Sequence, residues 1–203
     1  DSIDANCDGI DGDVTRAIFV DSENGNDESL GGRFDPVRSI TRGIELAAES
    51  NKDVYIGVGV YLETITLAQG VSLYGGYDPT QDWQRTRAQQ SRVVGIRKGL
   101  IGVGIISETE VQRLSIAVSD AVFDGESSYG VVLTDSALVT LRDNTIEAGR
   151  GANGVAGVDG ALGSNGLTGS AGLDAQDSSN YFQDCSTRAG GVPGESFCDN
   201  TST

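Results

Sequence analysis

The stretch VYIGVGVYLETITLAQGVSLYGGYD, residues 54–78, alternates short apolar runs with glycine and polar residues. β-Branched and aromatic residues such as Val54, Tyr55 and Ile56 favour strands, while the glycines between runs favour turns. The same alternation continues as far as Ala148, so the sequence predicts an all-β domain built from many short strands. The later runs are SRVVGI (91–96), LIGVGIIS (100–107), EVQRLSIAV (110–118), YGVVLTD (129–135) and LVTLRDNTIEA (138–148).

One strand and one helix are predicted upstream of this stretch. AIFVD, residues 17–21, has the composition of a strand, and DPVRSITRGIELAAES, residues 35–50, has a helical pattern. Asp35 is the predicted N-cap and Pro36 suits the first helical position. We expect this helix to cover one open end of the β structure, where unpaired backbone groups need shielding. Its predicted apolar face is formed by Val37, Ile40, Ile44 and either Ala47 or Ala48.

A weak internal repeat links two of the strand-like stretches. The apolar positions Val111, Leu114 and Ile116 resemble Leu138, Leu141 and the segment 143–146, at an offset of about 27 residues. Repeats of this size with several short strands each favour a β-solenoid. A β-sandwich of hairpins stays open as the alternative, although Asn-Gly or Asp-Gly hairpin turns between matched strands are missing.

The order of motifs in residues 16–148 resembles that of a known family. A strand, a Gly-Asn-Asp loop, a proline-led helix and a Val-Tyr, Gly, Tyr-x-Glu segment follow one another, as in secreted bacterial proteins of the pectin-lyase-like class. The resemblance implies a right-handed parallel β-helix (solenoid) with one N-terminal capping helix, and it marks architecture far better than activity. Glycine-rich tails and acidic N-terminal loops also occur in that class. The matching positions are Gly25, Asn26, Asp27, Pro36, Ile40, Val54, Tyr55, Gly59, Tyr61, Glu63, Gly75 and Gly76.

A second repeat, of strict period three, follows the β domain. Three close-packed extended chains leave room only for a hydrogen atom at their shared axis, whereas a flexible linker has no reason to keep a register. The tract has no proline, which disfavours a collagen helix. It predicts a Gly-X-Y extended segment with polyglycine-II-like packing, against other subunits or against the β domain, and a flexible linker is the alternative. The glycines are Gly151, Gly154, Gly157, Gly160, Gly163, Gly166, Gly169 and Gly172.

The acidic N-terminus, DANCDGIDGD at residues 4–13, carries the strongest chemical signal. Its first ligands alternate as in the first half of an EF-hand loop, with Gly9 at the tight turn and a backbone carbonyl as the seventh-position ligand. The twelfth position, normally glutamate, is Thr15, so later aspartates would have to supply the charge. The alternative is a solvated acidic terminus. The predicted Ca²⁺ ligands are Asp4, Asn6, Asp8, Ile10 (backbone carbonyl), Asp11 and Asp13.

Other candidate sites are weaker. The acidic loop DSENGNDE, residues 21–28, could hold a cation, but a turn leading to the helix explains it as well. Trp83, Arg85, Arg87 and Arg92 form the one basic-aromatic cluster, which we interpret as a long surface loop. No converging pair of carboxylates stands out in the strand segments, so no catalytic residue is predicted.

Composition narrows the function classes. The chain of 203 residues has no histidine and a formal net charge of −16, from 30 acidic and 14 basic residues. Histidine is the commonest general base and metal ligand, and nucleic-acid binding needs basic patches. No apolar run approaches the ~20 residues of a membrane span. The balance favours divalent cations and argues against nucleic acid and membrane insertion.

Cysteine usage and the missing methionine suggest an oxidising compartment. Cys185 and Cys198 lie in one short segment and are predicted to form a disulfide, which leaves Cys7 as a free thiol or an intermolecular bond. Three reduced thiols in a cytosolic protein are the alternative. Because the chain contains no methionine, we expect its first residue to arise by cleavage, and we expect a secreted or cell-surface bacterial protein.

Four segments follow from these patterns: an acidic calcium loop (1–14), a β-helix domain (15–148), the Gly-X-Y tract (149–175) and a polar tail (176–203). The expected function is that of an extracellular structural or adhesive protein. It would be stabilised by Ca²⁺ and would assemble with itself into oligomers or fibres through Gly151–Gly172 and the ends of the β domain. Cell-surface or matrix polysaccharide is a further expected partner. A polysaccharide-binding module and a calcium-dependent polysaccharide lyase are the alternatives.

Overall fold

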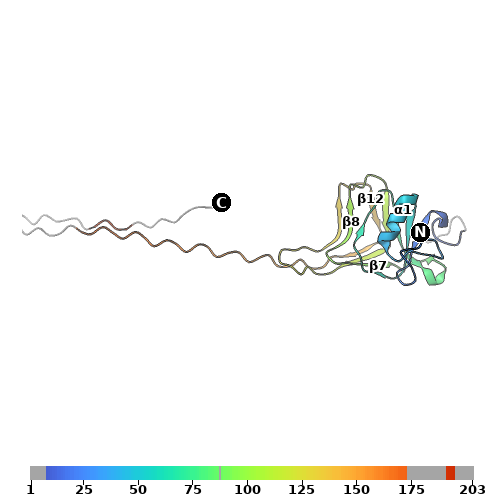
Figure 1. Cartoon of the computed structure of the whole chain (residues 1–203), viewed down its shortest axis with the longest axis horizontal. Coiled ribbons are helices and arrows are strands. Elements are labelled where there is room, and N and C mark those ends of the chain that lie inside the picture. The colour runs from blue at the N-terminus through green and yellow to red at the C-terminus, as the bar shows by residue number, and fades with distance from the viewer. Residues whose placement is uncertain (1–7, 87, 173–190, 195–203) are drawn as a thin grey trace, which may run out of the picture. The chain divides into compact units, whose positions relative to one another are not determined.

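The computed structural model describes residues 8–86, 88–172 and 191–194 (Figure 1). The chain divides into two compact units, Asp1–Val155 and Ala156–Thr203. Every helix and strand assigned within the described ranges belongs to the first unit. None of these helices has the length and apolar character needed to cross a membrane.

The first unit is built from three β-sheets that are almost entirely parallel. The first sheet has six strands, the second four and the third three. In spatial order, the first contains β1 (Ala17–Val20), β2 (Asp53–Gly57), β5 (Leu73–Asp78), β9 (Thr109–Gln112) and β12 (Val139–Arg142), with β6 (Gln84–Arg85) beside β5. The second contains β13 (Thr145–Glu147), β10 (Leu114–Val118), β7 (Ser91–Gly95) and β3 (Val60–Tyr61), and the third β11 (Tyr129–Thr134), β8 (Lys98–Val103) and β4 (Ile65–Thr66).

The sequence predicts a right-handed parallel β-helix (solenoid), and this prediction is wrong. The strands lie in three separate sheets and no closed solenoid is seen among the described residues. Parallel pairing and a single helix are present, and only β5 and β6 pair antiparallel, which also speaks against a sandwich of hairpins. The sheets stay separate because sharp corners interrupt the strands: Arg113 and Asp143 have φ values of 56° and 53° where the chain passes from the first sheet to the second.

The helix α1 (Ile40–Ser50) begins later than the sequence predicts. Ser39, not Asp35, is the N-cap, and its hydroxyl accepts a hydrogen bond from the Arg42 amide at 3.2 Å. The segment before it stays extended because Val37 forms a bridge with Val20 of β1. The predicted face is otherwise confirmed, since Ile40, Ile44 and Ala47 are buried. Two short 3₁₀ helices, η1 (Val14–Arg16) and η2 (Pro79–Gln81), complete the elements.

The core is organised as rows of apolar side chains that run across the sheets. In the first sheet, register places Ile18, Val54, Leu73, Val111 and Leu141 directly opposite one another on successive strands. The first four are buried, whereas Leu141 on the last strand is 36% exposed. Each side chain in a row is therefore shielded by its equivalent on the next strand, and the last one lacks that cover.

The same register gives the spacing of the weak repeat. Val111 pairs with Leu141 and Ile116 with Ile146, so equivalent positions on these strands lie 30 residues apart. The offset of about 27 predicted from the sequence is wrong, because it matched Val111 with Leu138, three residues before its actual register partner Leu141. Asn144 occupies the position equivalent to Leu114 and bonds to it: its Oδ1 accepts the Leu114 amide at 2.8 Å.

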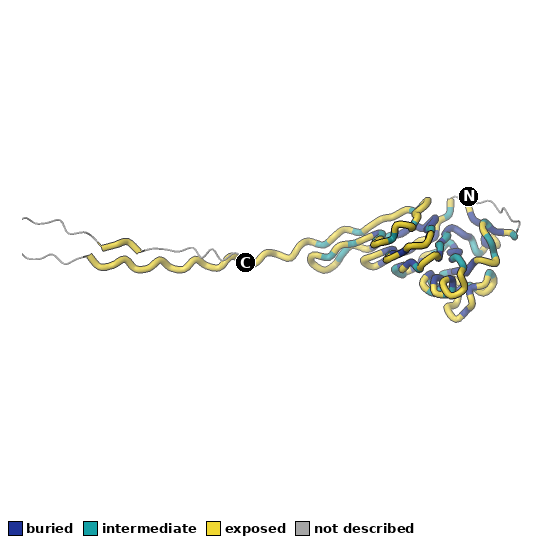
Figure 2. Tube along the Cα trace, turned by 90° about the horizontal axis from the view of Figure 1, so that it is seen from above, coloured by how far each residue is buried: buried dark blue, intermediate teal, exposed yellow. Residues whose placement is uncertain are grey.

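The described part of the second unit is extended and carries no helix or strand. Residues 156–172 are exposed along their length (Figure 2). The segment 191–194 lies beside the end of this tract: the Ser170 amide donates to the Val192 carbonyl at 3.1 Å, and the Val192 amide donates to the Ser170 hydroxyl at 2.9 Å.

The row arrangement predicts that a leucine-to-alanine substitution lowers the free energy of unfolding more in the middle of a row than at its end. Leu73→Ala should lower the free energy of unfolding by about 2–5 kcal/mol, since it leaves a cavity in a closed part of the core. Leu141→Ala, in the same row, should cost less than half as much because solvent already reaches that side chain. Urea unfolding of dilute protein would measure both, and equal losses would contradict the row model.

Candidate functional site

The outer face of the first sheet carries a second row, aromatic on β1, β2 and β5 and polar on β9 and β12, that alternates with the core row. Register places Phe19, Tyr55, Tyr74, Gln112 and Arg142 opposite one another on β1, β2, β5, β9 and β12. Successive side chains of a strand point to opposite faces, so this row faces away from the main core, and its members Phe19 and Tyr55 are buried in a second apolar cluster on the outer face. It contributes to a polar cleft of about 250 Å³, lined by Asp11, Gly12, Asp53, Tyr55, Tyr74, Tyr77, Arg85, Glu110, Gln112 and Arg142.

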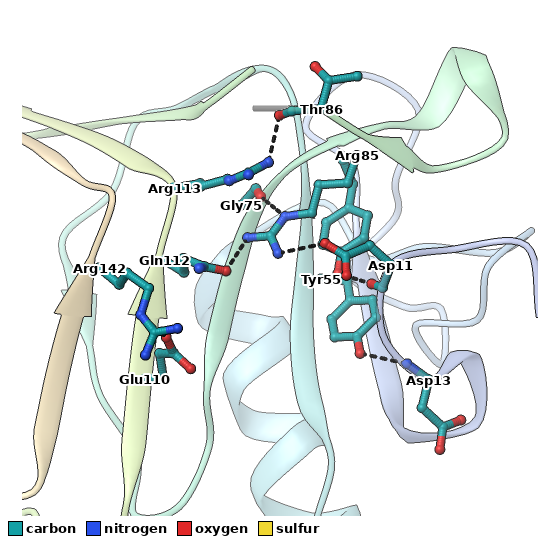
Figure 3. A network of polar contacts seen from close by, with 11 residues as sticks. Asp11, Asp13, Tyr55, Gly75, Arg85, Thr86, Glu110, Gln112, Arg113 and Arg142 are labelled. Atoms are coloured by element: carbon teal, nitrogen blue, oxygen red, sulfur yellow. Dashed lines mark hydrogen bonds and ion pairs between the residues drawn. The ribbon is translucent and has the colours of Figure 1, made fainter. Parts of the chain in front are cut away.

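Arg85 on β6 is the centre of this polar cleft (Figure 3). Its side chain is only 3% exposed. Nε donates to the Gly75 carbonyl at 2.8 Å, Nη2 donates to Gln112 Oε1 at 2.8 Å, and Nη1 pairs with the Asp11 carboxylate at 3.2 Å. The guanidinium also lies 5.1 Å from the centre of the Tyr77 ring, a distance that allows a cation–π contact.

Two tyrosines tie the N-terminal segment to the sheet. The Tyr77 hydroxyl donates to the Asp11 carbonyl at 2.6 Å, and the Asp13 amide donates to the Tyr55 hydroxyl at 3.0 Å. The two rings stack with their centres 4.8 Å apart. Burial raises the pKa of both hydroxyls, so they remain neutral and keep these hydrogen bonds over the ordinary pH range.

The remaining carboxylates of the polar cleft are also engaged within the chain. Burial raises the pKa of Asp53, while a hydrogen bond from the Ser72 amide at 3.1 Å opposes that shift. Glu110 Oε1 lies 3.2 Å from Arg142 Nε, an ion pair without the geometry of a hydrogen bond. The arrangement is therefore best suited to holding the strands and the N-terminal segment together, because its charges already meet partners inside the molecule.

The predicted calcium residues are only partly described. Asp4 and Asn6 lie outside the described residues. The Asp8 carboxylate accepts amide hydrogens from Ile10 at 3.1 Å and Val14 at 2.8 Å, and Ile10 itself is buried.

Asp13 caps η1: its carboxylate accepts hydrogen bonds from the Thr15 amide and hydroxyl at 2.9 and 2.7 Å, which lower its pKa. Asp11 pairs with Arg85. Within residues 8–86, 88–172 and 191–194, no three acidic or cysteine side chains gather closely enough to hold a metal ion.

The acidic loop at residues 21–28 behaves as a turn. Asp21 accepts the Glu23 amide at 2.9 Å, and Asp27 accepts the amides of Arg38 and Ser39 at 2.8 Å each. These carboxylates thus hold the loop against the segment that leads into α1.

The sequence places Trp83 and Arg85 in a surface loop, and this prediction is wrong because both side chains are buried. Trp83 is 4% exposed; its ring centre lies 4.7 Å from that of Phe19, and its Nε1 donates to the Arg33 carbonyl at 3.1 Å. Pairing of β6 with β5 places Trp83 and Arg85 over the first sheet. The signal was available, since Trp83 and Arg85 alternate with polar residues at strand spacing. Arg92 is exposed on β7, whereas Arg87 and the three cysteines lie outside the described residues.

No family model matches the chain, and neither a curated protein nor a solved structure was found to match it. The resemblance to the pectin-lyase-like class therefore depends on the sequence motifs quoted above.

The buried ion pair gives a stability prediction. Arg85→Met should lower the free energy of unfolding by about 3–5 kcal/mol, because it leaves the Asp11 carboxylate and two oxygen acceptors without their buried donor. Arg150→Met is the matched control: Arg150 pairs with Asp120 in solvent, so the unfolding free energy should hardly change. If chemical unfolding showed equal losses of unfolding free energy for the two variants, the buried Arg85 network would contribute no more stability than the exposed pair.

Calcium binding at residues 4–13 stays a prediction. Ca²⁺ should raise the midpoint of thermal unfolding progressively with its concentration, as expected for a ligand that binds the folded state, and Mg²⁺ should do so much less. Asp4→Asn should remove the effect, whereas Glu49→Gln on the exposed side of α1 should preserve it. A midpoint that responds equally to both ions, or equally in both variants, would contradict a specific site.

Proposed function

We propose that this chain is an extracellular structural protein that associates with copies of itself through the glycine tract, residues 151–172. The β module of the first unit would be the domain that such an assembly carries. The observation that supports the proposal is the segment 191–194, which packs on the tract through glycine positions. The strict period of the glycines and their full exposure agree with it.

Contact between the tract and residues 191–194 requires glycine. A Cβ added at Gly191 would overlap the Ser170 carbonyl oxygen, and one at Gly194 would overlap that of Leu167. These two glycines are themselves three residues apart, the period of the tract. Two extended strands therefore approach backbone to backbone at positions where side chains are missing, which is the type of packing that a three-residue glycine period allows.

The earlier part of the tract keeps the period although no neighbour of this kind is found among the described residues. A Cβ at Gly154, Gly157, Gly160 or Gly163 would meet nothing within 4 Å. No contact with the described residues thus gives a reason for glycine at these positions. Close approach of a strand from another copy would give that reason, and it explains why the register continues.

Repulsion between negatively charged copies opposes the association and makes it depend on ionic strength. The chain carries a formal net charge of −16, so copies repel one another at low ionic strength. Salt screens such repulsion over about 10 Å at 0.1 M. Assembly should therefore strengthen with ionic strength, in contrast to an interface held by ion pairs between copies.

Polysaccharide binding at the polar cleft is the weaker candidate. Tyrosine, carboxylate and guanidinium groups can hydrogen-bond sugar hydroxyls, but here Arg85, Glu110 and Asp53 already have partners within the chain. A ligand would have to replace those bonds. The structural role needs no such exchange.

The open glycines provide a direct test. Replacing Gly154, Gly157 and Gly160 together by alanine should leave the first unit folded, because the added methyl groups meet no atom of residues 8–86, 88–172 or 191–194. It should strongly reduce self-association, since the methyl groups would hold a second strand away. Sedimentation velocity at moderate salt, over a range of protein concentrations, would measure the effect.

The control variant carries Ala156→Ser and Ala161→Ser, which change exposed positions of the same tract but preserve every glycine. It should associate like the unmodified chain. If the alanine variant also associates normally, or if the unmodified chain stays monomeric at every concentration, the proposed function is wrong.

A further inference from the structure

Three asparagines of the chain stand directly before a glycine, in the pairs Asn24–Gly25, Asn153–Gly154 and Asn165–Gly166. In such a pair the glycine amide nitrogen can attack the asparagine side chain, because glycine has no Cβ to hinder the approach and adopts many backbone conformations. The first two pairs belong to the first unit. They have the same covalent chemistry but different surroundings, so the structure decides which of them can react.

The groups of Asn24 and Gly25 that would take part in the reaction are held by hydrogen bonds. The Gly25 amide, which would be the nucleophile, donates to the Asp21 carbonyl at 2.9 Å. The Gly25 carbonyl accepts a hydrogen bond from Arg38 Nε at 3.1 Å, and Asn24 Nδ2 donates to the Asp21 carboxylate at 3.1 Å. Gly25 is also buried, and a Cβ there would overlap the Val37 carbonyl oxygen. This turn therefore cannot rotate unless the whole loop opens.

The pair Asn153–Gly154 lies where the chain leaves its last backbone contacts with residues 125–126. The Ala152 amide donates to the Glu126 carbonyl at 3.0 Å, and the Gly125 amide donates to the Asn153 carbonyl at 2.7 Å. Both Asn153 and Gly154 are exposed, and a Cβ at Gly154 would meet nothing within 4 Å. Among the described residues, none accepts a hydrogen bond from the Gly154 amide. Rotation of this peptide group thus breaks one exposed hydrogen bond and meets no steric barrier.

We infer that Asn153 is a site of spontaneous deamidation, whereas the fold protects Asn24. The Gly154 amide nitrogen forms a bond to the side-chain carbonyl carbon of Asn153 and gives up its proton. The bond from that carbon to the side-chain nitrogen breaks, and the nitrogen leaves as ammonia with the proton. Water then opens the five-membered succinimide ring at either carbonyl carbon, which gives aspartate or isoaspartate. The step needs no oxidant, reductant or enzyme.

Both products change the start of the glycine tract. Each adds a negative charge to a chain whose formal net charge is already −16. Isoaspartate also carries the main chain through its Cβ, so it places one extra backbone atom between Gly151 and Gly154 and breaks the period of three. Weaker association of modified copies would follow, and close packing on Gly154 would in turn slow the reaction. These two consequences rest on the proposed function, but the modification itself does not.

The test is peptide mapping by mass spectrometry of dilute folded protein kept at mildly alkaline pH. The protein carries Asn165→Gln, which removes the third pair. Asn153 should convert with time to aspartate and isoaspartate, and protein L-isoaspartate methyltransferase should label the same peptide. Asn24 should convert at least ~tenfold more slowly, because local opening must precede its reaction. In urea the two asparagines should react at similar rates, since only the fold distinguishes them.

Gly154→Ala is the matched variant: its Cβ should slow the reaction at Asn153 and leave that at Asn24 unchanged. The inference is overturned if Asn153 stays unmodified in the folded protein, if Asn24 converts equally fast there, or if Asn24 remains unreactive in urea. Dilution keeps copies apart, so these outcomes do not depend on whether the tract associates. If raising the protein concentration at moderate salt leaves the rate at Asn153 unchanged, that result counts against the proposed function and not against the modification.

Discussion

Parallel stacking of equivalent side chains is the constraint on which the first unit depends. Each inward-facing residue of a sheet is shielded mainly by its counterpart on the neighbouring strand, as Leu73 is by Val54 and Val111. The core is consequently a set of rows and has two ends. Each Å² of apolar surface that is buried stabilises the fold by about 25 cal/mol. A side chain in a row is fully buried only where a further strand follows. The ends must be covered by something other than the repeat, and this requirement explains the positions of α1 and of the exposed leucines.

The buried arginine network solves a related problem on the outer face of the first sheet. The short strand β6 pairs with β5, and its Arg85 reaches Gly75, Gln112 and Asp11, which belong to separate parts of the chain. Removing a guanidinium from water is costly unless its donors are satisfied, so the network fixes these segments relative to one another. An acidic N-terminal segment is thereby held against the sheet even though the chain as a whole is strongly negative.

Short-range patterns predicted the local elements better than their arrangement. Strand composition located β5, β7, β8 and β11, and apolar spacing located the buried face of α1, because these features depend on neighbouring residues only. The start of α1 was missed since the bridge between Val20 and Val37 holds the preceding residues extended. The partnership of Arg85 with Asp11 joins residues 74 positions apart, and no local pattern records such a contact. The role of Trp83 was missed because a two-residue strand, β6, is too short for composition to reveal.

The two kinds of exposed surface differ in the partners that they can accept. Extended glycine strands pair through backbone alone, so they can add neighbours on several sides and have no inherent limit on number. The last strands of the three sheets, β12, β13 and β11, instead present side chains and strand edges at fixed positions. Because an assembly grows without limit only when its contacts do not close on themselves, the glycine tract would determine whether the product is a fibre or a finite oligomer.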